Sequence, residues 1–529
     1  MTSSLSGKHK WTAIATILLA IGLIPVPAMT AGKVARSGSF RFEPMWGPYA
    51  VGLKVVEQYD ASRTYRYAID DLGKEYHGVR ARPLQTLIWY PAVSGDRMRM
   101  TLADYVNLWA TETSFEHPRM PFKEKQWLSS LGGSVSESLH ASRDASPTEG
   151  RFPVVIYAPG ASDMAWENLD LCEYLASFGY VVIAAPSLGE KGPTMPIDLS
   201  GANTQAKDIS FLLTFSQTLP NTDMSAVAVV GDSWGGLAAL FAAARDDRIK
   251  ALVALDGSMR YYPGLVRTGD VHPEKLTLPL LYFMQGDYSL ELRDLYGDPL
   301  VRDGPSVLNS WNHGDLVIVH MLGMPHAAMC SIWQRNEDLW QTWGKSAWQP
   351  GDYDREDSVV SYGWLARYTR AFLDAYIKHD AAASRLLKDS PSENGVPKHL
   401  VAVRYAAGSG AALSVEDFRA EIGRQGFDHL SNIYASFQAR DKDFSLSESV
   451  IADWASELLS EDHPTEAIAL FELNAKNHPE SDRAYAHLGD AYRIAGLLDK
   501  AANSYRRALA KSPNESAVKK KLEELGGAP

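Results

Sequence analysis

One stretch decides the expected fold: Val227-Ala-Val-Val-Gly-Asp-Ser-Trp-Gly-Gly236, followed directly by Leu237-Ala-Ala-Leu-Phe-Ala-Ala-Ala244. It begins with a short apolar, β-branched run that is typical of a buried strand, and it ends in a run that is typical of a helix. Gly231 and Gly235 flank Ser233 and avoid side chains where the strand and the helix approach each other closely. The pattern predicts a strand, a sharp turn that presents Ser233, and a helix, and therefore a nucleophilic serine.

Further apolar runs on both sides of this stretch are expected to be strands, at residues 153–158, 180–185, 249–255, 278–284 and 315–322. Helical runs separate them, and an amphipathic helix expected at 362–378 closes the region. Apolar strands that alternate with helices indicate a parallel sheet with helices on both faces. The predicted fold is α/β, with a doubly wound, mostly parallel sheet. Before it we expect a strand at 82–91 and a serine-rich surface loop at 134–146.

Chemically competent side chains stand at the ends of several expected strands. Ser233, Asp256, Asp287 and His326 all come at or just after such an end, and the carboxyl ends of parallel strands meet at one edge of a sheet. A serine hydroxyl needs a base within hydrogen-bond reach, and the base needs a carboxylate to orient it. We interpret Ser233 as the nucleophile, His326 as the base and Asp256 as the acid, with Asp287 as the alternative acid.

Acyl transfer also needs hydrogen-bond donors for the developing oxyanion. We expect these donors to be the backbone N–H groups of Trp234 and Ala161. Ala161 lies in the loop Pro159-Gly-Ala-Ser162, and the alternative is that this loop is a plain strand-to-helix turn without a catalytic role. His313 and His320 compete with His326, but the first precedes the last strand and the second lies inside it. Tryptophans are dense between residues 311 and 364, where they either line an acyl pocket or anchor a long insertion.

The run from about residue 85 to 378 resembles the α/β-hydrolase superfamily, and within it the branch of dienelactone-hydrolase-like and platelet-activating-factor-acetylhydrolase-like proteins. The matching features are Leu87-Ile-Trp-Tyr-Pro-Ala92, Tyr157-Ala-Pro-Gly-Ala161, Gly231-Asp-Ser-Trp-Gly-Gly236, Leu255-Asp256 and His326. In the acetylhydrolase-like group the acid follows the strand after the nucleophile, which favours Asp256. Dienelactone hydrolases have a cysteine where this chain has Ser233, and relatives often have histidine at Pro159. The resemblance implies the reaction class and leaves the substrate open.

The C-terminal part repeats with a fixed period. Phe437, Phe471 and Tyr505 recur at a constant interval, and Ala467 and Ala501 are separated by the same interval. With Leu488-Gly489 and Tyr492, these positions resemble tetratricopeptide repeats, with two clear repeats at about 448–481 and 482–515. Such arrays form concave grooves. The unit is therefore expected either to bind a peptide or protein partner or to act as a stabilising or dimerising appendage.

The N-terminal segment, from Met1 to Ala31, has the composition of a secretory signal. Lys8 and Lys10 precede a short apolar run that ends in small residues, as export requires. No later segment is long and apolar enough to span a membrane, so a periplasmic or secreted protein is expected. The net charge of −12 and the lack of a dense basic patch argue against nucleic acid as the main partner. Cys172 and Cys330 are expected to be buried thiols, and no metal or organic cofactor is expected.

Together these patterns predict a signal peptide at 1–31, an α/β-hydrolase domain at 32–388, a linker at 389–413 and a helical repeat domain at 414–529. The predicted function is that of an exported serine hydrolase that cleaves a carboxylic ester or related acyl bond of a small molecule through an acyl-enzyme. A peptidase or C–C hydrolase is the alternative within enzymes. A binding or scaffold protein that acts through its helical repeats is the alternative outside them.

Overall fold

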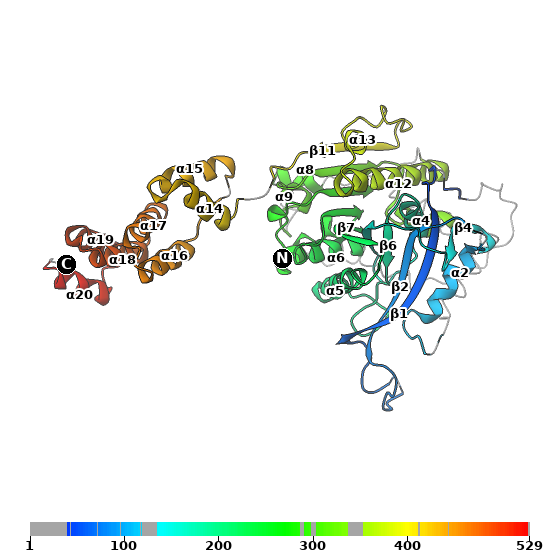
Figure 1. Cartoon of the computed structure of the whole chain (residues 1–529), viewed down its shortest axis with the longest axis horizontal. Coiled ribbons are helices and arrows are strands. Elements are labelled where there is room, and N and C mark those ends of the chain that lie inside the picture. The colour runs from blue at the N-terminus through cyan, green and yellow to red at the C-terminus, as the bar shows by residue number, and fades with distance from the viewer. Residues whose placement is uncertain are drawn as a thin grey trace, which may run out of the picture. The chain divides into compact units, whose positions relative to one another are not determined.

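The computed structural model describes residues 40–526, except 43, 71, 96, 117, 119–134, 286–289, 298–302, 337–352, 411–412 and 443. The chain divides after Gly410 into two compact units. The first unit contains one large sheet, and the second is helical (Figure 1). The signal peptide predicted at 1–31 lies outside the described residues. None of the described helices is long and apolar enough to cross a membrane.

Among the described residues, eleven strands form the sheet, in the order β11-β10-β9-β8-β7-β5-β6-β2-β1-β4-β3. The strands from β10 to β6 in this order run parallel to one another, which confirms the predicted, mostly parallel sheet. Their bounds are β5 (Phe152–Ala158), β6 (Val181–Ala184), β7 (Thr222–Asp232), β8 (Ala251–Leu255), β9 (Leu280–Gln285) and β10 (Leu316–Met321). Antiparallel to β6 lies β2 (Ala81–Ala92), and antiparallel to β2 lies β1 (Ala50–Thr64).

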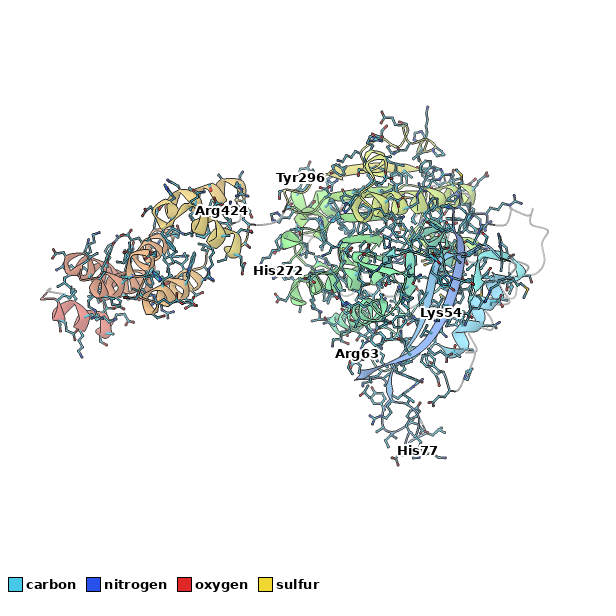
Figure 2. The ribbon with its side chains drawn as sticks, viewed as in Figure 1. Lys54, Arg63, His77, His272, Tyr296 and Arg424 are labelled. Atoms are coloured by element: carbon cyan, nitrogen blue, oxygen red, sulfur yellow. The ribbon has the colours of Figure 1, made fainter. Side chains whose placement is uncertain are left out.

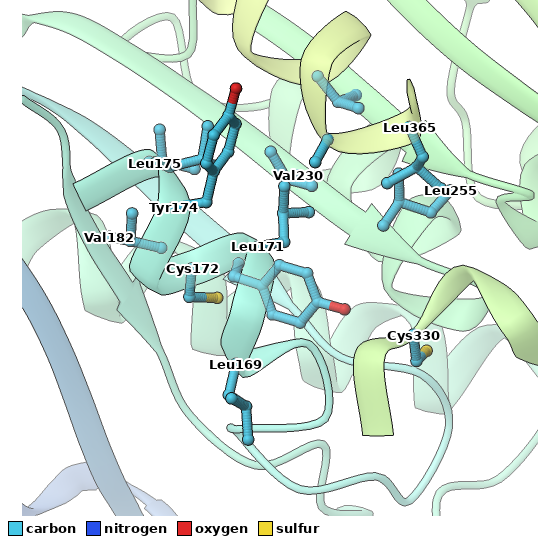
Figure 3. Packing of buried hydrophobic residues seen from close by; sticks show 14 of the residues in the cluster. Leu169, Leu171, Cys172, Tyr174, Leu175, Val182, Val230, Leu255, Cys330 and Leu365 are labelled. Carbon is cyan, nitrogen blue, oxygen red and sulfur yellow. The ribbon is translucent and has the colours of Figure 1, made fainter. Parts of the chain in front are cut away.

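Both faces of this sheet are buried because successive side chains of a strand point to opposite sides. On β7, Val227 and Val229 pack into a core with α5 (Leu199–Ser216) and α6 (Trp234–Ala243). Ala228 and Val230 pack into the opposite core, with α4 (Leu169–Ser177) and α12 (Arg355–Ile377). Figure 3 shows side chains of this second core, with Leu171 of α4, Val230 and Leu365 of α12 close together.

Two segments that the sequence analysis placed outside the sheet are strands. The serine-rich loop expected at 134–146 contains β4 (Ser138–Arg143), which pairs with β1 and with the short β3 (Arg99–Thr101). The linker expected at 389–413 contains β11 (Val401–Ala406), which pairs antiparallel with β10. The sheet unit therefore continues past residue 388. Both strands were missed because each has only one sheltered face: β4 buries only Leu139 and Ala141, and on β11 alternate residues are exposed.

Polar caps start two of the helices, and one of these helices begins earlier than the apolar spacing predicted. The helix α12 starts at Arg355 rather than near residue 362. Its cap is Asp354, whose side chain accepts hydrogen bonds from the backbone N–H groups of Glu356 and Asp357. The helix α5 starts after Asp198, whose side chain accepts from the Gly201 N–H. A side chain that satisfies the free N–H groups of the first turn stabilises a helix by about 1 kcal/mol.

Strands β1 and β2 form a long hairpin whose connection, residues 65–80, extends away from the sheet (Figure 1). His77 lies on this connection and Arg63 at its base (Figure 2). The Arg63 Nη2 atom donates to Asp208 of α5 at 2.6 Å, and the buried Arg82 Nε donates to the same carboxylate at 2.7 Å. This pair of arginines fixes the base of the hairpin to the helix beneath it.

The second unit consists of helices that pair along the chain. They are α14 (Val415–Gln425), α15 (Leu430–Arg440), α16 (Glu448–Ser460), α17 (Pro464–Asn477), α18 (Asp482–Ile494), α19 (Leu498–Lys511) and α20 (Ser516–Glu524). The starts of α16 and α18 are separated by the same interval as the starts of α17 and α19, and this interval also separates Phe471 from Tyr505. The repeating residues Ala467, Phe471, Ala501 and Tyr505 are all buried in one core. Membership of the tetratricopeptide family stays a prediction.

Candidate active site

Ser233 occupies the sharp turn between β7 and α6. Its backbone has φ +47° and ψ −113°, a strained conformation for a residue with a side chain. A Cβ on Gly231 would lie 2.4 Å from the Gly235 backbone, and a Cβ on Gly235 would lie 2.0 Å from the Ala158 carbonyl oxygen. The two glycines are thus required by the close approach of strand and helix, as the sequence indicated. The turn presents Ser233 at the carboxyl end of the sheet.

Three of the predicted site residues meet in one hydrogen-bonded chain. The His326 Nε2 atom lies 2.9 Å from Ser233 Oγ, and its Nδ1 atom lies 2.6 Å from Asp256 Oδ2. His326 follows β10, Asp256 follows β8, and Ser233 follows β7. Asp256 is fully buried. The arrangement has the connectivity that activates a serine hydroxyl: nucleophile to base, and base to orienting carboxylate.

The two expected oxyanion donors come from neighbouring strands. Ala158 of β5 is paired with Gly231 of β7, so the loop that carries Ala161 starts beside the turn that carries Trp234. Within the part of the chain that the structure describes, neither the Ala161 N–H nor the Trp234 N–H donates a hydrogen bond. Both groups are therefore available to an external acceptor. Free backbone N–H groups beside an activated serine are suited to hold the negative charge of a tetrahedral intermediate.

Comparison with known proteins finds similarity within this unit. Residues 140–287, which include Ala161, Ser233 and Asp256 and end before His326, match the model of the Dienelactone hydrolase family. The sheet unit has a dienelactone-hydrolase-like α/β-hydrolase fold. Among solved structures, a ferulic acid esterase from Streptomyces cinnamoneus matches at 19% sequence identity and a TM-score of 0.47, over 69% of this chain and 98% of that chain. No curated protein matches the chain significantly.

The candidate acid and base are held by two residues that the sequence analysis missed. Tyr261 donates its hydroxyl to Asp256 Oδ1 at 2.9 Å. The Gln285 side chain accepts from the His326 backbone N–H at 3.0 Å and donates to the Tyr261 hydroxyl at 3.3 Å. Gln285 thus links the loop that bears the base to the tyrosine that holds the acid. Its position at the carboxyl end of β9 was the available signal.

The charges around His326 favour its protonated form. Burial alone lowers the pKa of an imidazole, but the hydrogen bond and charge of Asp256, together with Asp232 and Asp163, outweigh it and raise the pKa of His326 to about 9. A general base must be neutral to accept a proton from the nucleophile. His326 therefore becomes able to accept a proton as the pH rises towards this value.

Several other sequence candidates are not part of this site. His320 lies inside β10 with a pKa lowered by burial, as expected of a packed histidine, and His313 contacts Ser409. Trp311 and Trp364 lie in the two opposite cores of the hydrolase unit, so these two anchor structure rather than line one pocket. Asp287, the alternative acid, lies outside the described residues, as do the tryptophans at 340, 343 and 348.

Among the described residues, one group of side chains has the spacing of metal ligands. The ligand atoms of Glu167, Asp232 and Cys330 lie within 4.8 Å of one another. Burial raises the pKa of the Cys330 thiol and of the Glu167 carboxyl well above their usual ranges, and the protonated forms do not bind metal. A cation at this position would have to displace these protons, and a metal-free site stays a prediction. Cys172 and Cys330 are both buried free thiols, as predicted.

Proposed function

We propose that the chain is a serine hydrolase that cleaves carboxylic esters of small molecules through an acyl-enzyme. The observation that carries the proposal is the chain of hydrogen bonds from Ser233 through His326 to the buried Asp256. The match of residues 140–287 to a family named for hydrolysis of dienelactones, which are esters, supports the same reaction class.

In the proposed reaction, Ser233 Oγ attacks the acyl carbonyl while His326 Nε2 takes the hydroxyl proton. Asp256 accepts the Nδ1–H and so keeps the Nε2 lone pair directed at the serine. The Trp234 and Ala161 N–H groups stabilise the oxyanion, and the proton on His326 passes to the leaving alcohol. A water molecule then gives its proton to His326 and attacks the acyl group, which releases the acid and restores Ser233.

The proposal is tested with a fluorophosphonate probe and p-nitrophenyl esters of increasing acyl length. We expect labelling of the wild type that Ser233→Ala and His326→Ala abolish, and a fall of about 10³- to 10⁴-fold in kcat for Asp256→Asn. His313→Ala is the matched control, because His313 contacts Ser409 and not the triad. A folded wild type that neither labels nor hydrolyses esters would overturn the proposal. Cleavage of peptide or carbon–carbon bonds in preference to esters would replace it with the alternative chemistry.

We further propose that the protein is exported to the periplasm or secreted, and that its helical unit binds a peptide or protein partner. The charge and apolar pattern of residues 1–31 supports the first proposal, and the helix pairs that repeat at a constant interval support the second. N-terminal sequencing of the mature protein tests the first, because it finds Met1 if no signal is removed. Cross-linking of the full chain against a chain without residues 411–529 tests the second.

A further inference from the structure

A buried carboxyl group forms a hydrogen bond with the loop that carries Ala161. Glu167, which is 1% exposed, accepts a hydrogen bond from the Gly160 N–H on its Oε1 atom at 3.0 Å. The same oxygen accepts from the Tyr157 hydroxyl at 2.7 Å. Tyr157 belongs to β5 and Gly160 to the loop after it, so one carboxyl oxygen ties the loop to its own strand.

Two more carboxyl groups meet Glu167 at this place. A Cβ on Gly160 would lie 2.7 Å from Asp163 Oδ2, 3.3 Å from Asp232 Oδ2 and 3.5 Å from Glu167 Oε2. Three acidic side chains thus surround one backbone position, and we call Asp163, Glu167 and Asp232 the carboxyl cluster. Since Asp232 directly precedes Ser233, the cluster lies between the turn of the nucleophile and the loop of Ala161.

No lysine or arginine of the described residues forms an ion pair with the carboxyl cluster. Glu167 Oε2 and Asp232 Oδ1 are buried and have no hydrogen-bond donor among those residues. Buried carboxylates of like charge disfavour ionisation of one another. Burial raises the pKa of Asp163 to about 6. Burial together with this repulsion raises the pKa of Asp232 to about 7 and that of Glu167 well above its usual range. Carboxyl O–H groups are therefore available to bond the unpaired oxygens.

The other hydrogen bonds of the loop do not involve the Gly160 N–H, so the position of this group depends on Glu167. The Gln205 side chain donates to the Pro159 carbonyl at 2.7 Å, and the Met195 N–H donates to Ser162 Oγ at 2.7 Å. These bonds hold the residues before and after the centre of the loop. The Gly160 N–H, next to Ala161, bonds only to Glu167 among the described residues.

We propose that Glu167 is a positioning residue of the hydrolase site, which sets the direction of the Ala161 N–H by holding the Gly160 N–H. The inference rests on the proposed ester hydrolysis. Glu167 itself does not touch the reacting atoms. Its acceptor oxygen is what matters and not its negative charge, because the surrounding carboxyl cluster favours a neutral group at this position.

The test compares Glu167→Gln with Glu167→Asp. Glutamine keeps a carbonyl oxygen for the Gly160 and Tyr157 donors, and its amide N–H groups face the neighbouring carboxyls as an O–H would. Aspartate keeps a carboxyl group but is one methylene shorter, about 1.5 Å, so it loses the reach to Gly160. For each variant, kcat and KM for a p-nitrophenyl ester are measured, together with the affinity for a trifluoromethyl ketone that forms the oxyanion adduct.

We expect Glu167→Asp to lower kcat by about 10²- to 10³-fold, as loss of one oxyanion donor does elsewhere. Its KM should stay within about threefold, and its affinity for the ketone should fall in parallel with kcat. Glu167→Gln should keep kcat within about threefold of the wild type. Tyr157→Phe, which leaves the Gly160 bond in place, should do the same.

Equal losses in Glu167→Gln and Glu167→Asp, or a Glu167→Asp variant with wild-type kcat, would overturn the inference. A fall in melting temperature without a fall in ketone affinity would also overturn it, because that result marks a structural role only. The proposed function fails separately, through a wild type without ester hydrolysis or with hydrolysis that survives Ser233→Ala. An active wild type with an insensitive Glu167 therefore rejects the positioning role alone.

Discussion

Gly235→Ala should damage the active site more than it damages the fold. An alanine Cβ at this position would lie 2.0 Å from the Ala158 carbonyl oxygen and 2.6 Å from the Pro159 carbonyl oxygen. Contacts of Cβ atoms below 3.0 Å essentially never occur, so strand and helix must separate by about 1 Å. Both crowded carbonyls belong to the backbone that leads into the Ala161 loop. The displacement is therefore imposed directly on one of the two expected oxyanion donors.

The size of the two effects follows from this displacement. Forcing one extra methyl group into a packed interior costs about 1–3 kcal/mol of stability, which lowers the melting temperature by several degrees in a unit of this size. A misplacement of about 1 Å in a catalytic group lowers the rate by about 10²-fold. We therefore expect a folded variant whose reactivity falls far more than its stability.

The assay is the second-order rate constant for labelling by a fluorophosphonate, read beside the melting temperature. Gly192→Ala is the matched control, since a Cβ there has no atom within 4 Å, and it should leave both quantities close to those of the wild type. If Gly235→Ala labels as fast as the wild type, the backbone approach described for the turn is incorrect.

Three further predictions concern the pKa of His326, the hydrogen bond from Tyr261 to Asp256 and the stability of the helical unit. Asp256 raises the pKa of His326 to about 9, and only the neutral imidazole accepts a proton. We therefore expect kcat/KM to increase with pH up to about that value. A pH profile of kcat/KM with its midpoint near 6.5, the ordinary pKa of histidine, would contradict this prediction. Tyr261→Phe removes the 2.9 Å hydrogen bond to Asp256, and a hydrogen bond to a charged acceptor is worth about 1.5–3 kcal/mol. We therefore expect kcat to fall by at least tenfold. The control variant Tyr262→Phe should leave kcat unchanged. Gly423 lies inside α14, and a Cβ added there has no atom within 4 Å. Gly423→Ala should therefore stabilise the helical unit by about 0.5–1 kcal/mol, measured by urea unfolding followed by circular dichroism. A destabilised variant would show that this face of the helix is covered.

The strands that could be predicted from the sequence are those buried on both faces. Val154 and Val155 pack into opposite cores, and such strands are continuously apolar. The strands that could not be predicted have one exposed face. On β1 the charged residues Lys54 and Glu57 interrupt the pattern, and on β11 only alternate residues are sheltered. A mixed pattern of this kind does not distinguish an edge strand from a loop, because pairing with a distant strand decides between them.

The residues of the candidate triad could be predicted because chemistry and position agree: each has a competent side chain and each ends a strand. Tyr261, Gln285 and Glu167 could not be predicted, because their roles depend on contacts between separate segments. Gln285 bonds to a backbone group 41 residues further along the chain, and Glu167, in the turn before α4, bonds to the loop that follows β5. Nothing in a single sequence distinguishes a glutamate that becomes buried under a backbone N–H from one that faces solvent.

The strand β11 also determines where the two units can be separated. Its residues Val401–Ala406 are paired along the whole of β10, and the Gly408 N–H then donates to Asp315 at 2.8 Å. Removal of the chain after residue 388 would leave β10 as an open edge with a row of unpaired backbone groups, and such edges recruit strands from other molecules. Expression of the hydrolase unit alone should therefore give soluble protein when the chain ends near residue 410 and aggregates when it ends at 388.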